Sequence, residues 1–83
     1  MTPGTRHGPW LYTAEKTGRR LTHVPSGWYV PLDCLAWRLS RGDTEAVERA
    51  IETASRKPWA TKASTDSLRA AFLSLRLVRR SAA

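Results

Sequence analysis

The stretch over residues 64–80 has the clearest periodic pattern of apolar positions in the chain. Its apolar residues recur at the i, i+3, i+4 and i+7 spacing of one helical face, at Leu68, Ala71, Phe72, Leu75 and Val78. Ser64 and Thr65 have side chains that cap helix N-termini, and Asp66 adds negative charge where the helix dipole favours it. The pattern therefore predicts a basic helix over residues 64–80 with one face in the core.

Two shorter helices are predicted before it, over residues 31–41 and 44–56. Pro31 suits a helix start, Gly42 a helix end, and Asp43 the N-cap of the second helix. The expected core positions are Leu32, Leu35, Ala36 and Leu39 in the first helix, and Val47, Ala50, Ile51 and Ala54 in the second. Cys34, the single cysteine, lies in the first helix, and we expect it to be a small core residue.

Residues 10–30 are rich in strand-forming side chains. Runs over residues 10–14, 19–24 and 28–30 are separated by turn-forming residues at 15–18 and 25–27. An isolated hairpin is marginal in water, so we expect a two- or three-stranded antiparallel meander packed on the three helices. Residues 1–9, with two prolines and two glycines, are predicted to be a flexible arm. The expected fold class is α+β, with a single small domain over residues 10–83.

The charge of this 83-residue chain narrows its range of partners. The formal net charge is +7, and arginine outnumbers lysine eleven to three. Residues 43–55 carry four acidic side chains and one basic one, whereas residues 56–83 carry seven basic side chains and one acidic one. A polarised basic domain favours nucleic acid or an acidic protein surface as its partner, although a solvated charged surface is the simpler explanation.

The basic last third supplies the candidate interface. Basic side chains release counterions from a phosphate backbone, and an exposed indole can stack on an unpaired base. The predicted contact residues are Lys57, Trp59, Lys62, Arg69, Arg76, Arg79 and Arg80, with Arg19 and Arg20 as a further contact beside the hairpin. Two alternatives remain open: Trp59 can cover the end of the core, and the arginines can pair with glutamates of the 44–56 helix.

A helix-turn-helix motif around residues 40–43 is disfavoured. The outer side of the 44–56 helix carries Glu45, Glu48 and Glu52, which would face phosphates at a Coulombic cost. If DNA is bound, we do not expect this helix to enter the groove.

The sequence gives no indication of catalysis. His7 lies in the predicted arm, His23 lies in a predicted strand where a structural role is expected, and no glycine-rich phosphate loop is present. No cysteine and histidine spacing suits a metal site. We therefore expect no enzyme activity, no cofactor, no metal and no small-molecule substrate. Without an apolar stretch long enough for a membrane span, we expect a cytoplasmic protein with no membrane partner.

Two functions fit these observations. The favoured one is a small basic binding module that regulates a nucleic-acid process by contacting DNA or RNA through its C-terminal third. The alternative is a phage-type inhibitor or adaptor that docks on an acidic surface of host nucleic-acid machinery, with Trp37, Leu73 and Leu77 as its anchors. A homodimer through the same leucines is not favoured, because the neighbouring arginines would approach their own copies.

Overall fold

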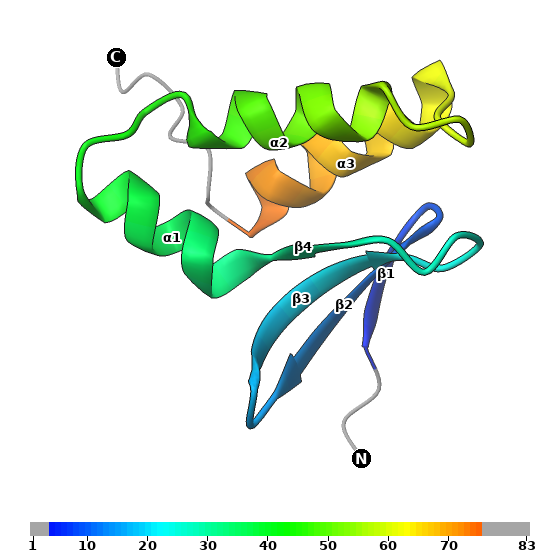
Figure 1. Ribbon diagram of the computed structural model, residues 1–83. Helices are drawn as coiled ribbons and strands as arrows, with labels where there is room; N and C mark the ends of the chain where they lie inside the picture. Colours follow the sequence, from blue (N-terminus) through cyan, green and yellow to red (C-terminus); the bar gives the residue numbers. More distant parts are fainter. Residues whose placement is uncertain (1–3, 76–83) are drawn as a thin grey trace.

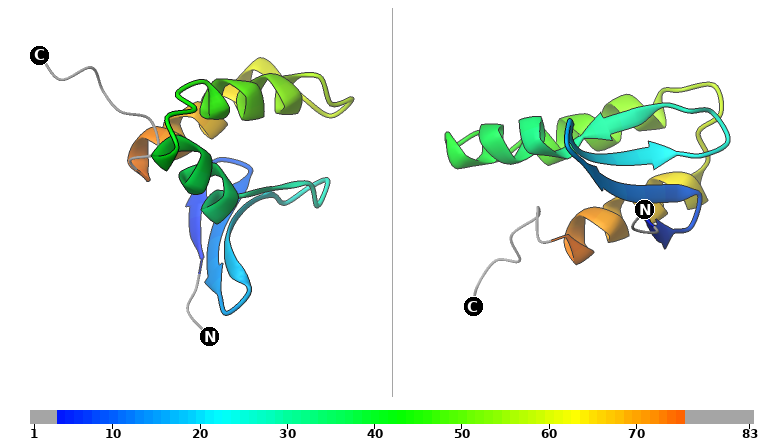
Figure 2. Two further views of the ribbon diagram at one scale, coloured as in Figure 1. Left: turned by 60° about the vertical axis from the view of Figure 1, so that its left-hand side comes forward. Right: turned by 90° about the horizontal axis from the view of Figure 1, so that it is seen from below.

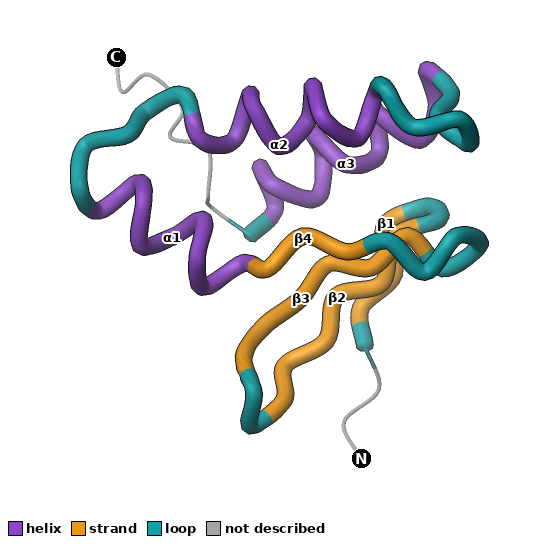
Figure 3. Tube along the Cα trace, viewed as in Figure 1, coloured by secondary structure: helices purple, strands orange, loops and turns teal. Residues whose placement is uncertain are grey.

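The computed structural model describes residues 4–75 and has an α+β fold, which confirms the predicted class (Figure 1). The strands are β1 (Thr5–His7), β2 (Trp10–Glu15), β3 (Gly18–His23) and β4 (Tyr29–Pro31). The helices are α1 (Leu32–Ser40), α2 (Ala46–Ser55) and α3 (Lys62–Ser74). The four strands precede the three helices in the chain, and the tube in Figure 3 shows the two groups segregated in space.

The sheet is an antiparallel meander in the order β1-β2-β3-β4, so it has four strands where two or three were predicted. The additional strand, β1, lies within the residues expected to form a loose arm, and that prediction is wrong for Thr5–His7. Gly8 makes the tight turn possible, because its φ of +60° suits glycine, and it brings His7 opposite Trp10. Gly18, with a φ of +127°, likewise closes the turn between β2 and β3.

The helices pack on one face of the sheet. The helix α3 contacts β1 and β2, α1 contacts β3, and α2 packs on α3 and α1. Figure 2 shows the resulting arrangement, in which the helices form a layer on one side of the sheet. Because neighbouring side chains of a strand point to opposite faces, Trp10, Leu21 and Val30 point toward the helices and are buried.

The predicted apolar stripe of α3 forms the centre of the core. Leu68, Ala71 and Phe72 are fully buried, and Leu75 is partly buried against the same cluster. The indole Nε1 of Trp10 donates a hydrogen bond of 2.8 Å to the carbonyl of Ser64, which joins the sheet to the first turn of α3. These contacts confirm the predicted core face of this helix at Leu68, Ala71 and Phe72.

The helix starts differ from those predicted. Thr61 caps α3: its Oγ1 accepts a hydrogen bond from the Ser64 amide, and the Ser64 Oγ accepts one from the Thr61 amide. Ser64 is therefore the third residue of the helix rather than its cap. The N-cap of α2 is Glu45 and not Asp43, and the Asp43 carboxylate pairs with Arg49. Residues 76–80 of the predicted helix lie outside the described residues.

Cys34 is exposed, so the expectation that it packs in the core is wrong. The helix α1 is a surface helix that buries Leu32 and Leu35 and half-buries Ala36 and Leu39. Cys34 lies beside this stripe and lines a shallow groove between α1 and α2 instead.

Candidate nucleic-acid interface

Three of the basic residues predicted to contact a partner are paired with carboxylates of the same chain. Arg69 binds Glu48 of α2, Lys62 binds Asp66 one turn along α3, and Arg19 binds Asp33 of α1. The Arg69 hydrogen bonds hold the pKa of the Glu48 carboxyl below its usual value. The alternative that α3 arginines pair with glutamates of the second helix is therefore realised at Arg69.

The pair of Arg19 and Asp33 joins the β2–β3 hairpin to α1. The Asp33 carboxylate accepts a hydrogen bond of 2.9 Å from the Arg19 amide and one of 2.8 Å from its Nε. These bonds lower the pKa of Asp33, first through the backbone donor and then through the guanidinium. Arg19 therefore has a structural partner in the place where a phosphate contact was predicted.

Trp59 belongs to an aromatic cluster that covers one end of the core. Its ring stacks on His23 with centroids 3.8 Å apart and planes inclined by 14°, and it contacts Trp10 and Trp28 at 5.9 Å each. Of the two alternatives for Trp59, this packing favours the structural one. His23 is nearly fully buried within the same cluster, and burial lowers its pKa, which favours the neutral ring.

The remaining described cations form a second class, which has no ion pair with a carboxylate among residues 4–75. The members of this class are Arg6, Lys16, Arg20, Arg38, Arg41 and Lys57. Three of them lie over aromatic rings instead. Arg20 lies 4.8 Å from the centroid of Tyr29, Arg41 lies 5.3 Å from Trp37, and Lys57 lies 5.5 Å from Trp28. These distances are within the range of cation–π attraction.

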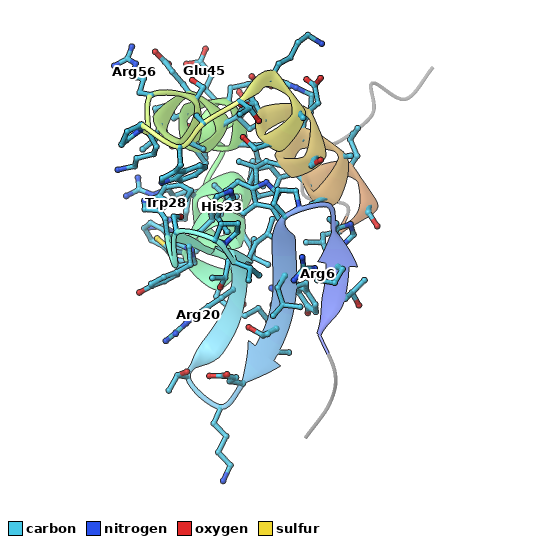
Figure 4. The ribbon with its side chains drawn as sticks, turned by 90° about the vertical axis from the view of Figure 1, so that its right-hand side faces the viewer. Arg6, Arg20, His23, Trp28, Glu45 and Arg56 are labelled. Atoms are coloured by element: carbon cyan, nitrogen blue, oxygen red, sulfur yellow. The ribbon has the colours of Figure 1, made fainter. Side chains whose placement is uncertain are left out.

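Two of these pairs adjoin at the start of β4. Trp28 and Tyr29 are consecutive, and their cations come from β3 and from the connection between α2 and α3. We call Arg20, Trp28, Tyr29 and Lys57 the β4 strip. In Figure 4, Arg20, Trp28 and Arg56 lie along the same side of the molecule, with Arg20 on the sheet and Arg56 at the helices.

A shallow groove of about 350 Å³ lies between β4, α1 and α2. Val30 and Pro31, which follow Tyr29, form one wall, and Arg38 and Arg49 contribute positive charge. Arg49 is paired with Asp43, whereas Arg38 has no such partner among the described residues. The strip therefore follows the β4 edge of the sheet, with Arg20 and Tyr29 on the face opposite the helices and Trp28 and Lys57 on the helix side.

Two of the proposed protein-binding anchors are exposed. The exposed fraction is 58% for Trp37 and 40% for Leu73. Leu77, Arg76, Arg79 and Arg80 lie outside the described residues.

The aromatic members of the strip were not predicted from the sequence. Trp28 and Tyr29 were considered only as strand formers, although alternation along Trp28, Tyr29 and Val30 places Tyr29 on the opposite face from its neighbours. That alternation identifies an exposed aromatic side chain in a predicted strand.

Within residues 4–75, no helix has both the length and the apolar character needed to cross a bilayer. In the same range, no three histidine, cysteine or acidic side chains are grouped as metal ligands. Comparison with family models found no match, and comparisons with curated proteins and with solved structures gave no significant match.

Proposed function

We propose that this chain is a small non-enzymatic module that regulates a nucleic-acid process by binding DNA or RNA. In this proposal the β4 strip makes the main contact, together with Arg38 in the adjoining groove. The observation that supports it most is the division of the cations. Arg19 and Arg69 pair with carboxylates of neighbouring elements, whereas Arg20 and Lys57 near β4 have no ion pair with a described carboxylate.

The energetics of these pairs favour exchange with a phosphate. An exposed cation–π contact contributes about 0.5–1 kcal/mol, whereas a hydrogen bond to a charged group contributes about 1.5–3 kcal/mol. Arg20 and Lys57 can therefore turn toward a phosphate at small cost. Arg69, by contrast, would have to leave the Glu48 carboxylate, which already accepts two of its hydrogen bonds.

The partner predicted for the C-terminal third is retained, but the contact surface is moved. Lys57 remains in it, Arg20 becomes central, and Trp59 has a structural role in the aromatic cluster. The chemistry is that of phosphate contact, which is independent of base sequence.

A second candidate function is binding to an acidic protein surface, and the exposed Trp37 favours it. Its ring is 58% exposed beside Arg41, and tryptophan with arginine is a frequent combination in interface hot spots. In this case the contact would be centred on α1 and not on β4.

Binding of a labelled mixed-sequence oligonucleotide to two double variants tests the proposal. Arg20→Gln with Lys57→Gln removes one arginine and one lysine of the strip. Arg56→Gln with Lys62→Gln removes the same charges from residues that pair with Glu52 and Asp66. We expect only the first pair of changes to weaken binding. Equal weakening by the two double variants would show that net charge alone is responsible. Binding to a protein that persists after nuclease digestion, and that only Trp37→Ala abolishes, would support the second function.

A further inference from the structure

The face of the sheet opposite the helices carries one continuous row of side chains across all four strands. The register pairs Arg6 with Leu11, Leu11 with Thr22, and Thr22 with Tyr29. All four residues lie on the face opposite the buried Trp10. We call this row and the adjacent Arg20 the open sheet face, since Arg20 lies over the Tyr29 ring on the same side.

The open sheet face has charge at its margins and a neutral centre. Neighbouring strands are about 4.8 Å apart, so the row extends about 14 Å from β1 to β4. Arg6 is exposed at one margin, Tyr29 is 45% exposed at the other, and Leu11 and Thr22 between them are half-buried. Figure 4 shows Arg6 and Arg20 at separate positions on the sheet.

The electrostatics of this face suit an anion that spans it. Among the described residues, the only carboxylate that alternation places here is Glu15, which lies at the hairpin end beside Lys16. Neither Arg6 nor Arg20 has a carboxylate partner within residues 4–75. Two guanidinium groups are thus available on either side of an uncharged surface.

We infer that the open sheet face binds a single-stranded nucleic acid, with one base stacked on Tyr29 and backbone phosphates at Arg6 and Arg20. This inference rests on the proposed nucleic-acid function and specifies its substrate class. The faces of duplex bases are hidden within the stack, so only an unpaired base can use an exposed ring on a sheet. The uncharged Leu11 and Thr22 leave room for the strand to pass between the two arginines.

A protein partner fits this face less well. The open sheet face has a single large exposed apolar side chain, Tyr29, whereas the other strongly exposed ones among residues 4–75, Val24, Trp37 and Leu73, lie in a loop and in the helices. An interface hot spot needs a cluster of apolar anchors that exclude water. An isolated ring between guanidinium groups is better suited to one stacked base.

Fluorescence anisotropy with two labelled probes tests this inference: an oligo(dT) strand of about 12 nucleotides and a mixed-sequence duplex of the same length. We expect the single strand to bind more tightly. Tyr29→Ala should weaken its binding by about 5- to 150-fold, whereas Tyr29→Phe should stay within about twofold of wild type because it keeps the ring. Trp37→Ala is the matched control, since it removes an exposed ring outside the sheet, and it should have no effect.

Arg6→Gln provides a second test at the opposite margin and should also weaken single-strand binding, even if Tyr29→Ala fails to fold. A duplex bound as tightly as the single strand, or unchanged single-strand binding by folded Tyr29→Ala or Arg6→Gln, would overturn the inference. If Arg20→Gln with Lys57→Gln still weakened duplex binding, the proposed function would stand. If neither probe bound at low salt, both proposals would fail.

Discussion

Arg69 of α3 donates two hydrogen bonds to the carboxylate of Glu48 in α2, with Nη1 to Oε1 at 2.5 Å and Nη2 to Oε2 at 3.1 Å. The two residues are far apart in the chain, and packing of the two helices brings them together. This bidentate contact gives Arg69 a structural role between two helices. The cations near β4, in contrast, have no such ion pair among the described residues.

We expect the Arg69–Glu48 pair to contribute modestly to stability. Both side chains are about half exposed, at 47% and 58%, so a double-mutant cycle with Arg69→Gln and Glu48→Gln should give a coupling of about 0.2–1 kcal/mol in urea unfolding. Because the pKa of Glu48 is lowered, this contribution is present above the unfolded-state pKa and is lost as pH falls through the folded-state value. Perfect additivity of the two changes would contradict the contact.

Trp59→Ala should destabilise the domain by about 3 kcal/mol or more, because it removes the ring stacked on His23 and opens the cluster around Trp10. A thermal melt followed by circular dichroism measures the effect, with Trp37→Ala as an exposed-tryptophan control. If Trp59→Ala melted at the wild-type temperature and lost only nucleic-acid binding, Trp59 would be a stacking platform and not part of the core.

Stability should fall in mildly acidic solution because of His23. Burial lowers its pKa below the ordinary value of 6.5, so the unfolded chain binds a proton at a higher pH than the native chain does. The loss should begin as pH drops below about 6.5 and end near the folded-state pKa. We expect the urea concentration at the unfolding midpoint to decrease when the pH is lowered from about 7.5 to about 5.5, and we expect His23→Gln to make this decrease smaller. An equal fall in both proteins would exclude His23 as its source.

The sequence predicted the local patterns well. The helical spacing of Leu68, Ala71 and Phe72 correctly identified the buried face of α3, and alternation in residues 10–24 identified two strands. The strand Thr5–His7 was missed because nearby prolines and glycines, which indicate loops in isolation, here flank a short edge strand. A three-residue edge strand depends on pairing with β2, which no local pattern reveals.

The candidate site was harder to predict, because it depends on contacts between distant residues. The basic character of Arg19, Lys57 and Arg69 is evident from the sequence, but it does not reveal which of them meets a carboxylate. Arg69 meets Glu48 because α3 packs on α2. Lys57 lies over the Trp28 ring because Trp59, two residues further along the chain, packs against Trp28. Free and paired cations could be separated only when the helix packing was known.

The salt dependence of single-strand binding tests the central claim most directly. Affinity for the oligo(dT) probe should fall linearly on a log–log plot, with a slope of about 0.7 per phosphate contacted. Replacing Arg6 and Arg20 by glutamine should reduce the slope by about 1.4, since both phosphate contacts of the open sheet face are lost, whereas replacing Arg56 and Lys62 should leave it unchanged. A wild-type affinity that hardly changes with salt, or equal slopes for the two double variants, would contradict the assignment of the open sheet face as a nucleic-acid interface.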